Sequence, residues 1–158
     1  MNTECLRIAD QLHRAFEGDA WHGPALRELL TSVTAEQANA RPLKSGHSIW
    51  ELVLHIDTYT YAALESVRGA PLPKIYGTEK DWPAVTDDGA PEWKKAADKL
   101  FQNATELSQA IKAFQDERLH DIVPGRQYDF YYLLHGIVQH SLYHGGQIAL
   151  LKRAIGPH

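Results

Sequence analysis

The chain has 158 residues, of which 44% are hydrophobic and 23% are charged, and its formal net charge is −4. This length fits a single domain over residues 1–158 that can bury a core without disulfides. With a net negative charge, the sequence indicates no basic surface that could bind phosphate groups, so we expect no nucleic-acid partner. The longest apolar runs fall far short of the roughly 20 residues that cross a bilayer, so we expect no membrane partner. One cysteine, Cys5, and several charges among the first fifteen residues predict a cytoplasmic protein without a secretory signal.

Helical periodicity dominates the first part of the sequence. Apolar residues recur at three-to-four spacing from Thr3 to Glu17, which predicts a first long helix that ends at Gly18. A short helix is expected from Pro24. The capping box formed by residues 34–37 predicts another helical turn or two.

A second long helix is expected from Ser48, because Ser48 and Glu51 have the spacing of a capping box, and Gly69 ends it. Residues 69–91 hold four of the eight prolines, which predicts a long irregular crossover between the second and third long helices. Trp82 is expected to pin this crossover to the body of the protein.

The third long helix is expected from Pro91 to about Phe114, since proline suits the first turn of a helix. The last long helix should run from about Asp129 to Ala154 and end at Gly156 and Pro157. No strand pattern is convincing. Four long helices with one long middle connection predict an all-α four-helix bundle. Such bundles place metal and ligand sites between facing helices, so polar residues on the buried faces are the candidates for function.

Nine histidines beside one cysteine and one methionine are the unusual feature of the composition. On a helical wheel His140 and His144 lie about 40° apart, within the apolar stripe of the last helix. Their Cβ atoms should be about 5–6 Å apart, so two imidazoles can converge on one cation. His135 points about 180° from His144 and does not belong to this pair.

A third ligand has to come from another helix, and His55 in the middle of the second long helix is the best candidate. Three neutral imidazoles around zinc leave one position for water or substrate, which is typical of a catalytic site. A metal held in this way can acidify water or stabilise a thiolate. The segment from His140 to His144 lacks the glutamate of the HExxH motif, which argues against a zincin protease. The alternative is that these histidines only form hydrogen bonds in the core.

Three further polar residues share these helix faces and are candidates for lining a pocket. Gln147 could contact substrate, or it could bond to the backbone of a facing helix. Tyr59 could line the pocket or belong to the core. Glu51 could serve as a base, although its capping-box position already gives it a structural role.

The remaining histidines and the glycines of the last helix carry weaker signals. Glycine costs about 1 kcal/mol in a helix interior, so glycines there leave room for a ligand or allow close helix approach. Those glycines are Gly136, Gly145 and Gly146. The other histidines are expected in end loops or at the surface: His13, His22, His47, His120 and His158.

Two segments carry a resemblance to a known family. Residues 48–55 read Ser-Ile-Trp-Glu-Leu-Val-Leu-His, and residues 140–148 read His-Ser-Leu-Tyr-His-Gly-Gly-Gln-Ile. With this spacing and helix order, the chain resembles the DinB-like superfamily, also called the YfiT-like metal-dependent hydrolases. The resemblance implies an up-down-down-up four-helix bundle, often a homodimer. It also implies that His55, His140 and His144 bind a divalent metal, commonly zinc or nickel.

The resemblance leaves the activity open. Some relatives are transferases that use bacillithiol, mycothiol or another low-molecular-weight thiol as co-substrate, whereas others are described as hydrolases. Both reactions would use the metal to activate a nucleophile, water or thiol, against a small electrophile. The competing hypothesis is a non-catalytic metal- or ligand-binding stress-response protein.

Overall fold

The computed structural model describes residues 3–156, so Pro157 and His158 lie outside the described residues. It is all-helical, as predicted, and the described part of the chain contains no strand beyond one isolated bridge between Ile122 and Asp129. The four long helices are α1 (Thr3–Phe16), α4 (Ile49–Val67), α5 (Ala90–Ala113) and α6 (Phe130–Ile155). The short ones are α2 (Leu26–Leu30), α3 (Ala35–Asn39) and the 3₁₀ helix η1 (Asp116–His120).

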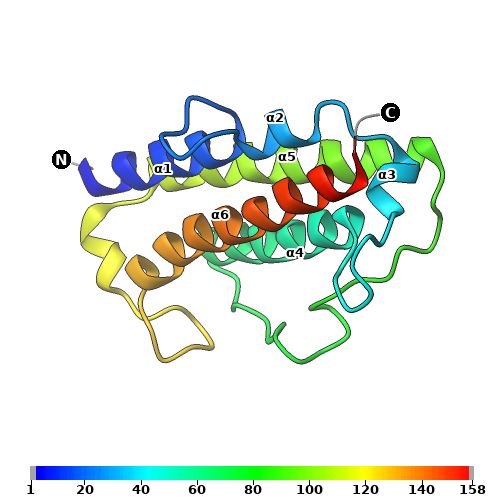
Figure 1. The fold of residues 1–158 in the computed structure, drawn as a ribbon. Coiled ribbons are helices and arrows are strands. Elements are labelled where there is room, and N and C mark those ends of the chain that lie inside the picture. The colour runs from blue at the N-terminus through cyan, green and yellow to red at the C-terminus, as the bar shows by residue number, and fades with distance from the viewer. Residues whose placement is uncertain (1–2, 157–158) are drawn as a thin grey trace.

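The four long helices lie side by side as a bundle (Figure 1). In that view α1 and α6 run in one direction, whereas α4 and α5 run in the other. The parallel packing of α4 and α5 is visible in two contacts: the rings of Trp50 and Trp93 are 5.3 Å apart, and Asn103 Nδ2 donates to Asp57 Oδ1 at 2.7 Å. The helix α6 packs on both α4 and α1.

Hydrogen bonds at the helix starts explain where the elements begin. The Ser48 hydroxyl accepts from the Glu51 backbone N–H at 3.2 Å, and the Glu51 carboxylate accepts from the Ser48 N–H at 2.9 Å. The capping box predicted at residues 34–37 forms in the same way at the start of α3. The helix α2 starts at Leu26 rather than at Pro24, because Ala25 is the N-cap and its N–H donates to Glu28 at 2.8 Å.

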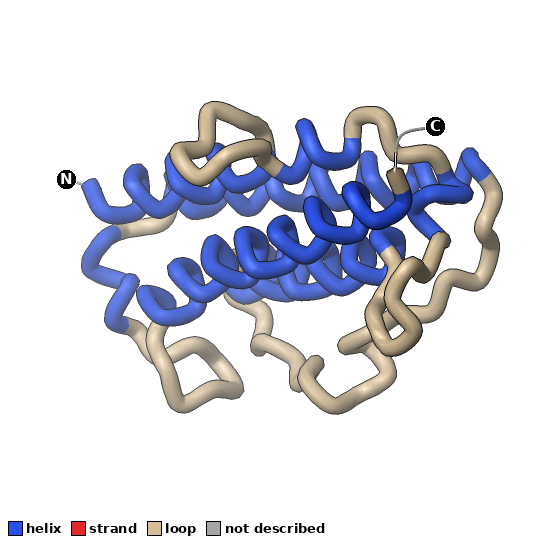
Figure 2. Tube along the Cα trace, viewed as in Figure 1, coloured by secondary structure: helices blue, strands red, loops and turns tan. Residues whose placement is uncertain are grey.

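The connection between α4 and α5 is long because the two helices are parallel. A chain that leaves α4 has to return along its whole length, about 28 Å for 19 residues, before α5 can begin. In Figure 2 this connection is the long tan loop on the lower side of the molecule. Leu72 and Ile75 are buried in the hydrophobic core, so the connection packs against the body of the bundle.

The core fills the space between the long helices with aliphatic side chains, and polar residues interrupt it at the interface of α4 and α6. His55 is 5% exposed and His144 is 6% exposed, so both side chains are buried like those of the core. Buried polar groups are costly unless they are bonded, so this interface is where function should be sought.

Candidate metal centre

Three histidines from two antiparallel helices meet at this interface. His55 projects from α4, and His140 and His144 project from successive turns of α6. One ring nitrogen from each lies within 4.8 Å of the other two. The Nε2 atoms of His55 and His140 are 3.0 Å apart. The structure therefore brings together the three histidines singled out in the sequence.

Hydrogen bonds determine which nitrogen of two of these rings carries the proton. His55 Nδ1 lies 2.5 Å from the backbone carbonyl oxygen of Asp81, and His144 Nδ1 lies 3.0 Å from Oε1 of Gln147. Carbonyl oxygens only accept hydrogen bonds, so in both rings Nδ1 is the donor. Nε2 is then the unprotonated nitrogen of both rings, and in His55 this atom faces His140, as metal ligation requires.

The surroundings also keep the imidazoles neutral. Burial lowers the pKa of His55 and of His144 below the usual histidine range. Burial, assisted by the adjacent His144 and His55, lowers the pKa of His140 to about 3. A neutral imidazole is the form that binds a metal, so at pH 7 the three rings are ready to act as ligands.

The donor set fits a divalent transition metal. Two ligand nitrogens on one tetrahedral zinc ion are about 3.3–3.4 Å apart, close to the His55–His140 separation of 3.0 Å. Imidazole nitrogens suit zinc, nickel, copper and iron, whereas calcium and magnesium prefer oxygen. The group found among the described residues contains three histidines and no carboxylate. His55, His140 and His144 can therefore hold a metal, and their chemistry argues against calcium or magnesium.

Asp81 in the crossover bonds to His55 through its backbone, and its side chain bonds to residues beside His55. Its carbonyl accepts from His55, and its carboxylate accepts from the Tyr59 hydroxyl at 2.9 Å and from the Gly77 N–H at 3.1 Å. Burial and the adjacent carboxylate raise the pKa of Tyr59 well above its usual value, so its hydroxyl stays protonated as a donor. The Tyr59 ring also lies 4.7 Å from that of His140.

Trp82 follows directly and covers His55. Its ring stacks on His55 at 3.9 Å and on His47 at 3.4 Å, nearly parallel to both. Two parallel rings this close to one indole have to lie on its opposite faces, so Trp82 is sandwiched between the histidines. The prediction that Trp82 anchors the crossover is confirmed. His47 is exposed, as expected for an end loop, but its ring belongs to this stack.

Glu51 has the capping role that its sequence position predicts, whereas Gln147 has a partner that the sequence did not indicate. Glu51 closes the capping box of α4 and pairs with Arg41, so its carboxylate is engaged at the helix start. Gln147 was expected to contact substrate or to bond to the backbone of a facing helix, but its side-chain oxygen accepts from His144 in the same helix. The prediction that His135 points elsewhere is confirmed, since it lies 3.5 Å from Glu4 of α1.

The helical glycines do not share one role. A Cβ atom at Gly145 would lie 3.6 Å from Leu26, so this glycine sits at the contact between α6 and α2. A Cβ atom at Gly136 or Gly146 would meet nothing within 4 Å. Of the three glycines, only Gly145 therefore lies at a close contact between helices.

The sequence did not indicate Asp81. It lies 26 residues beyond His55 in a segment without periodicity, so no helical spacing connects the two residues. Two features of the sequence could have pointed to Asp81. It precedes Trp82, the expected anchor, and it is an acidic residue in a segment rich in proline and glycine. Only the folded crossover shows that its carbonyl and carboxylate face α4.

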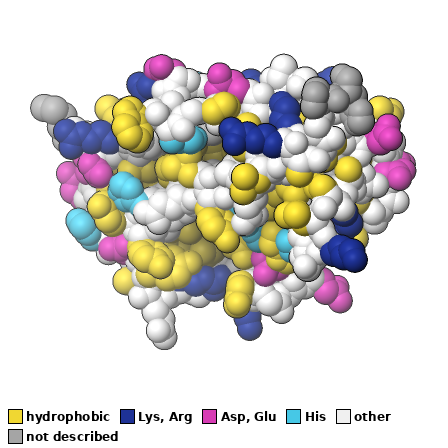
Figure 3. Space-filling view, viewed as in Figure 1, with side chains coloured by type: hydrophobic (Ala, Val, Ile, Leu, Met, Phe, Trp, Pro, Cys, Tyr) yellow, Lys and Arg dark blue, Asp and Glu magenta, His cyan; other side chains and the backbone are white. Residues whose placement is uncertain are grey.

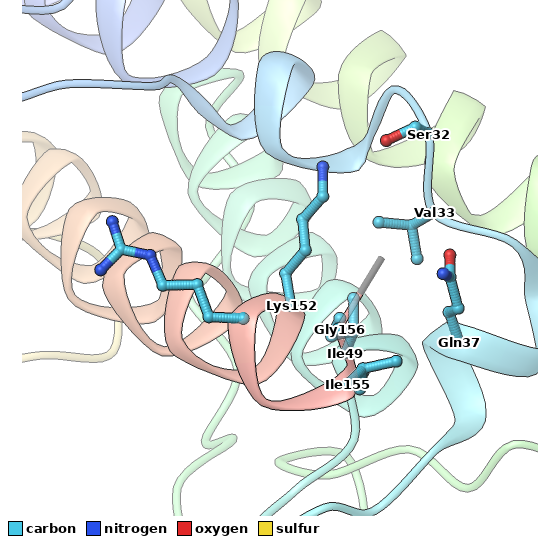
Figure 4. A pocket seen from close by; sticks show the side chains of 8 residues that line it. Ser32, Val33, Gln37, Ile49, Lys152, Ile155 and Gly156 are labelled. Atoms are coloured by element: carbon cyan, nitrogen blue, oxygen red, sulfur yellow. The ribbon is translucent and has the colours of Figure 1, made fainter. Parts of the chain in front are cut away.

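Histidines also occur at the surface, and a separate cavity lies near the end of α6. In Figure 3 histidine atoms reach the surface beside hydrophobic side chains. A separate cavity of about 490 Å³ lies near the end of α6, where Lys152 reaches toward the segment of Ser32 and Val33 (Figure 4). The Lys152 ammonium donates to the Leu29 carbonyl at 2.7 Å, so it is already bonded to the protein. This residue lies two turns, about 12 Å, beyond His144 along the helix.

The fold and the site together define an all-helical bundle protein with a buried three-histidine group that can hold a metal. The chain belongs to the DinB superfamily, whose family model matches residues 19–148. The crystal structure of a conserved protein from Enterococcus faecalis has a similar fold, with a TM-score of 0.64, 17% identity, and coverage of 96% of this chain and 94% of that one. No significant match was found among curated proteins. No helix in the described part of the chain is long and apolar enough to cross a membrane.

Proposed function

We propose that this protein is a metal-dependent enzyme that holds zinc or nickel on His55, His140 and His144. The site would activate a water or a low-molecular-weight thiol for attack on a small electrophile. The observation that carries this proposal is the convergence of three neutral ring nitrogens, two of them in rings oriented by carbonyl oxygens. Three protein ligands leave at least one coordination position for a nucleophile or substrate.

Each part of the site has a definite role in this proposal. When bound, a divalent metal supplies a Lewis acid that lowers the pKa of water or of a thiol. Asp81 and Gln147 hold the rings of His55 and His144 in the orientation that ligation needs. Trp82 covers one face of His55 and keeps water from that side.

The hydrogen-bonding state of the nearby carboxylates favours a thiol as the nucleophile. The Asp81 carboxylate accepts from Tyr59 and Gly77, and the Glu51 carboxylate is engaged at the start of α4. Neither is free to act as a general base. A thiol with a pKa near 8.5 loses its proton far more readily than water does, so it needs such a base least.

An activity screen tests this function. Metal-loaded protein is incubated with 1-chloro-2,4-dinitrobenzene and with 4-nitrophenyl acetate, each with and without bacillithiol, cysteine or 2-mercaptoethanol. Thiol-dependent turnover supports the transferase, and thiol-independent turnover supports the hydrolase. His144→Ala should abolish either activity, whereas the matched variant His135→Ala should retain it. Metal-loaded protein that is inactive under every condition would contradict the enzyme proposal and favour a non-catalytic metal-binding protein.

A further inference from the structure

A cavity of about 760 Å³ lies between α4, the crossover and Lys99 of α5. Its lining on α4 begins at Asp57, which lies about 200° around the helix from His55. None of the three histidines of the metal centre lines it. The cavity is therefore separate from the metal centre, and its volume falls in the range of about 300–1,000 Å³ that is usual for small-molecule sites.

Much of the cavity wall is apolar. The crossover contributes Pro71, Pro73 and Pro83, and proline has no backbone N–H to donate to a ligand. Ala62 of α4 and Ile75 of the crossover also line the cavity, and both belong to the hydrophobic core. These surfaces favour a ligand with an apolar body.

Asp57 is the half-buried acidic group of this cavity at the contact between α4 and α5. Its Oδ1 atom accepts from Asn103 Nδ2 at 2.7 Å, and the described residues give its Oδ2 atom no hydrogen bond or ion pair. A half-buried carboxylate attracts a cation more strongly than an exposed one does, because water and salt screen it less. Asp57 therefore favours a ligand with a positive charge.

The other charges at the cavity are compensated or exposed. Glu65 pairs with Arg68 at 3.1 Å. Glu79 and Lys80 are consecutive, exposed residues of opposite charge, so together they add no net charge. Neither pair therefore opposes the preference for a cation.

Tyr61 lies one turn after Asp57 on the same face of α4, where Cβ atoms four residues apart are about 5–6 Å from each other. The ammonium group of Lys99 lies 6.0 Å from the centroid of the Tyr61 ring, at the outer limit of a cation–π contact. A ligand ammonium group held by Asp57 could approach this ring more closely. The carboxylate and the ring together suit a primary amine.

We propose that the cavity between α4 and the crossover binds an organic amine, with its ammonium group on Asp57 beside Tyr61 and its apolar body against the prolines of the crossover. This site does not depend on the metal centre. It gives the protein a second ligand, of a different chemical class from the electrophile and the thiol.

Three probes with the same ring and different charges test this site at pH 7. They are 2-phenylethylamine, which is protonated as a lysine side chain is, the neutral 2-phenylethanol and the anionic 3-phenylpropanoate. Isothermal titration calorimetry with the wild-type protein should show that the amine binds about tenfold more tightly than the alcohol. The anion should bind more weakly than the alcohol. Methylamine, which has no apolar body, should bind more weakly than 2-phenylethylamine.

Two pairs of variants locate the amine. Asp57→Asn keeps an acceptor for Asn103 but removes the charge, and it should weaken amine binding about tenfold. Asp98→Asn is its control, an exposed carboxylate on α5 that pairs with Lys94. Tyr61→Leu should weaken amine binding about threefold. Its control is Tyr131→Leu, because these two tyrosines are 48% and 45% exposed.

An amine can also coordinate a metal, so His144→Ala shows at which site the probe binds. This variant should retain the amine affinity of the wild-type protein, since His144 does not line the cavity. Loss of amine binding in His144→Ala would overturn the inference, as would equal affinities for the amine and the alcohol. An unchanged amine affinity in Asp57→Asn, with circular dichroism showing a folded protein, would also overturn it. None of these results bears on the metal content of the protein, which tests the proposed function separately.

Discussion

The three histidines of the centre differ in what orients their rings. Gln147 holds His144 from one turn further along α6, so both members of this pair come from a single helix. Asp81 holds His55 from the crossover, so this pair depends on tertiary structure. The HxxxH spacing could be recognised in the sequence, whereas the roles of Gln147 and Asp81 in orienting the rings could not.

Removal of the oxygen that orients His144 should weaken metal binding without unfolding the protein. Gln147→Leu leaves the His144 Nδ1–H without its acceptor, and loss of such an outer partner typically costs about 10–100-fold in metal affinity. Zn²⁺ affinity measured by competition with a chromophoric chelator checks this expectation. Gln139→Leu, at an exposed position of α6, is the matched control and should leave the affinity unchanged. Equal affinities of the two variants would contradict the role given to Gln147.

At the scale of the elements, helix ends are held by side chains from distant parts of the chain. The Asp116 carboxylate of η1 accepts from the backbone N–H groups of Glu4 at 3.0 Å and of Cys5 at 2.9 Å, at the start of α1. The hydrogen bond from the Cys5 backbone, with that from Glu4, lowers the pKa of Asp116 to about 2. An anion at a helix N-terminus also interacts favourably with the helix dipole.

This contact should make the free energy of unfolding sensitive to acid. The pKa of Asp116 is lower in the folded than in the unfolded chain, so its stabilising effect is complete above about pH 4 and is lost as the pH falls through about 2. Urea denaturation between pH 5 and pH 3 should show a decline that is shallower in Asp116→Asn, which has no titrating carboxylate at this position. Identical pH profiles for both proteins would contradict the assignment.

Two glycines should respond in opposite ways to alanine. Gly146 lies inside α6 with free space around it, so Gly146→Ala should raise the free energy of unfolding by about 0.5–1 kcal/mol through helix propensity. Gly125 has a φ of +83°, and a Cβ there would lie 3.4 Å from the Leu72 carbonyl oxygen. Gly125→Ala should therefore lower the free energy of unfolding by about 1–2 kcal/mol. Urea titrations at pH 7 measure both changes, and a shift of the same sign in both would be inconsistent with this account.

At the scale of the molecule, the sequence was sufficient for the bundle and for the three histidines. Capping boxes at residues 34–37 and 48–51 and the apolar stripe around His140 follow from local spacing, which the fold preserves. The crossover could be predicted only as irregular, because its anchors Asp81 and Trp82 act through contacts with α4 that no periodicity encodes. A single domain over residues 1–158 and a homodimer remain predictions.

The most direct test of the central claim is the metal content of untagged protein, measured by elemental analysis. The account predicts about one equivalent of a divalent transition metal per chain, either as purified or after reconstitution and dialysis. His135→Ala should retain this equivalent, and His144→Ala should retain less than about a tenth of it. A wild-type protein with less than about a tenth of an equivalent and no rebinding would contradict the metal centre. Loss of the metal in His135→Ala with retention in His144→Ala would contradict the assignment of its ligands.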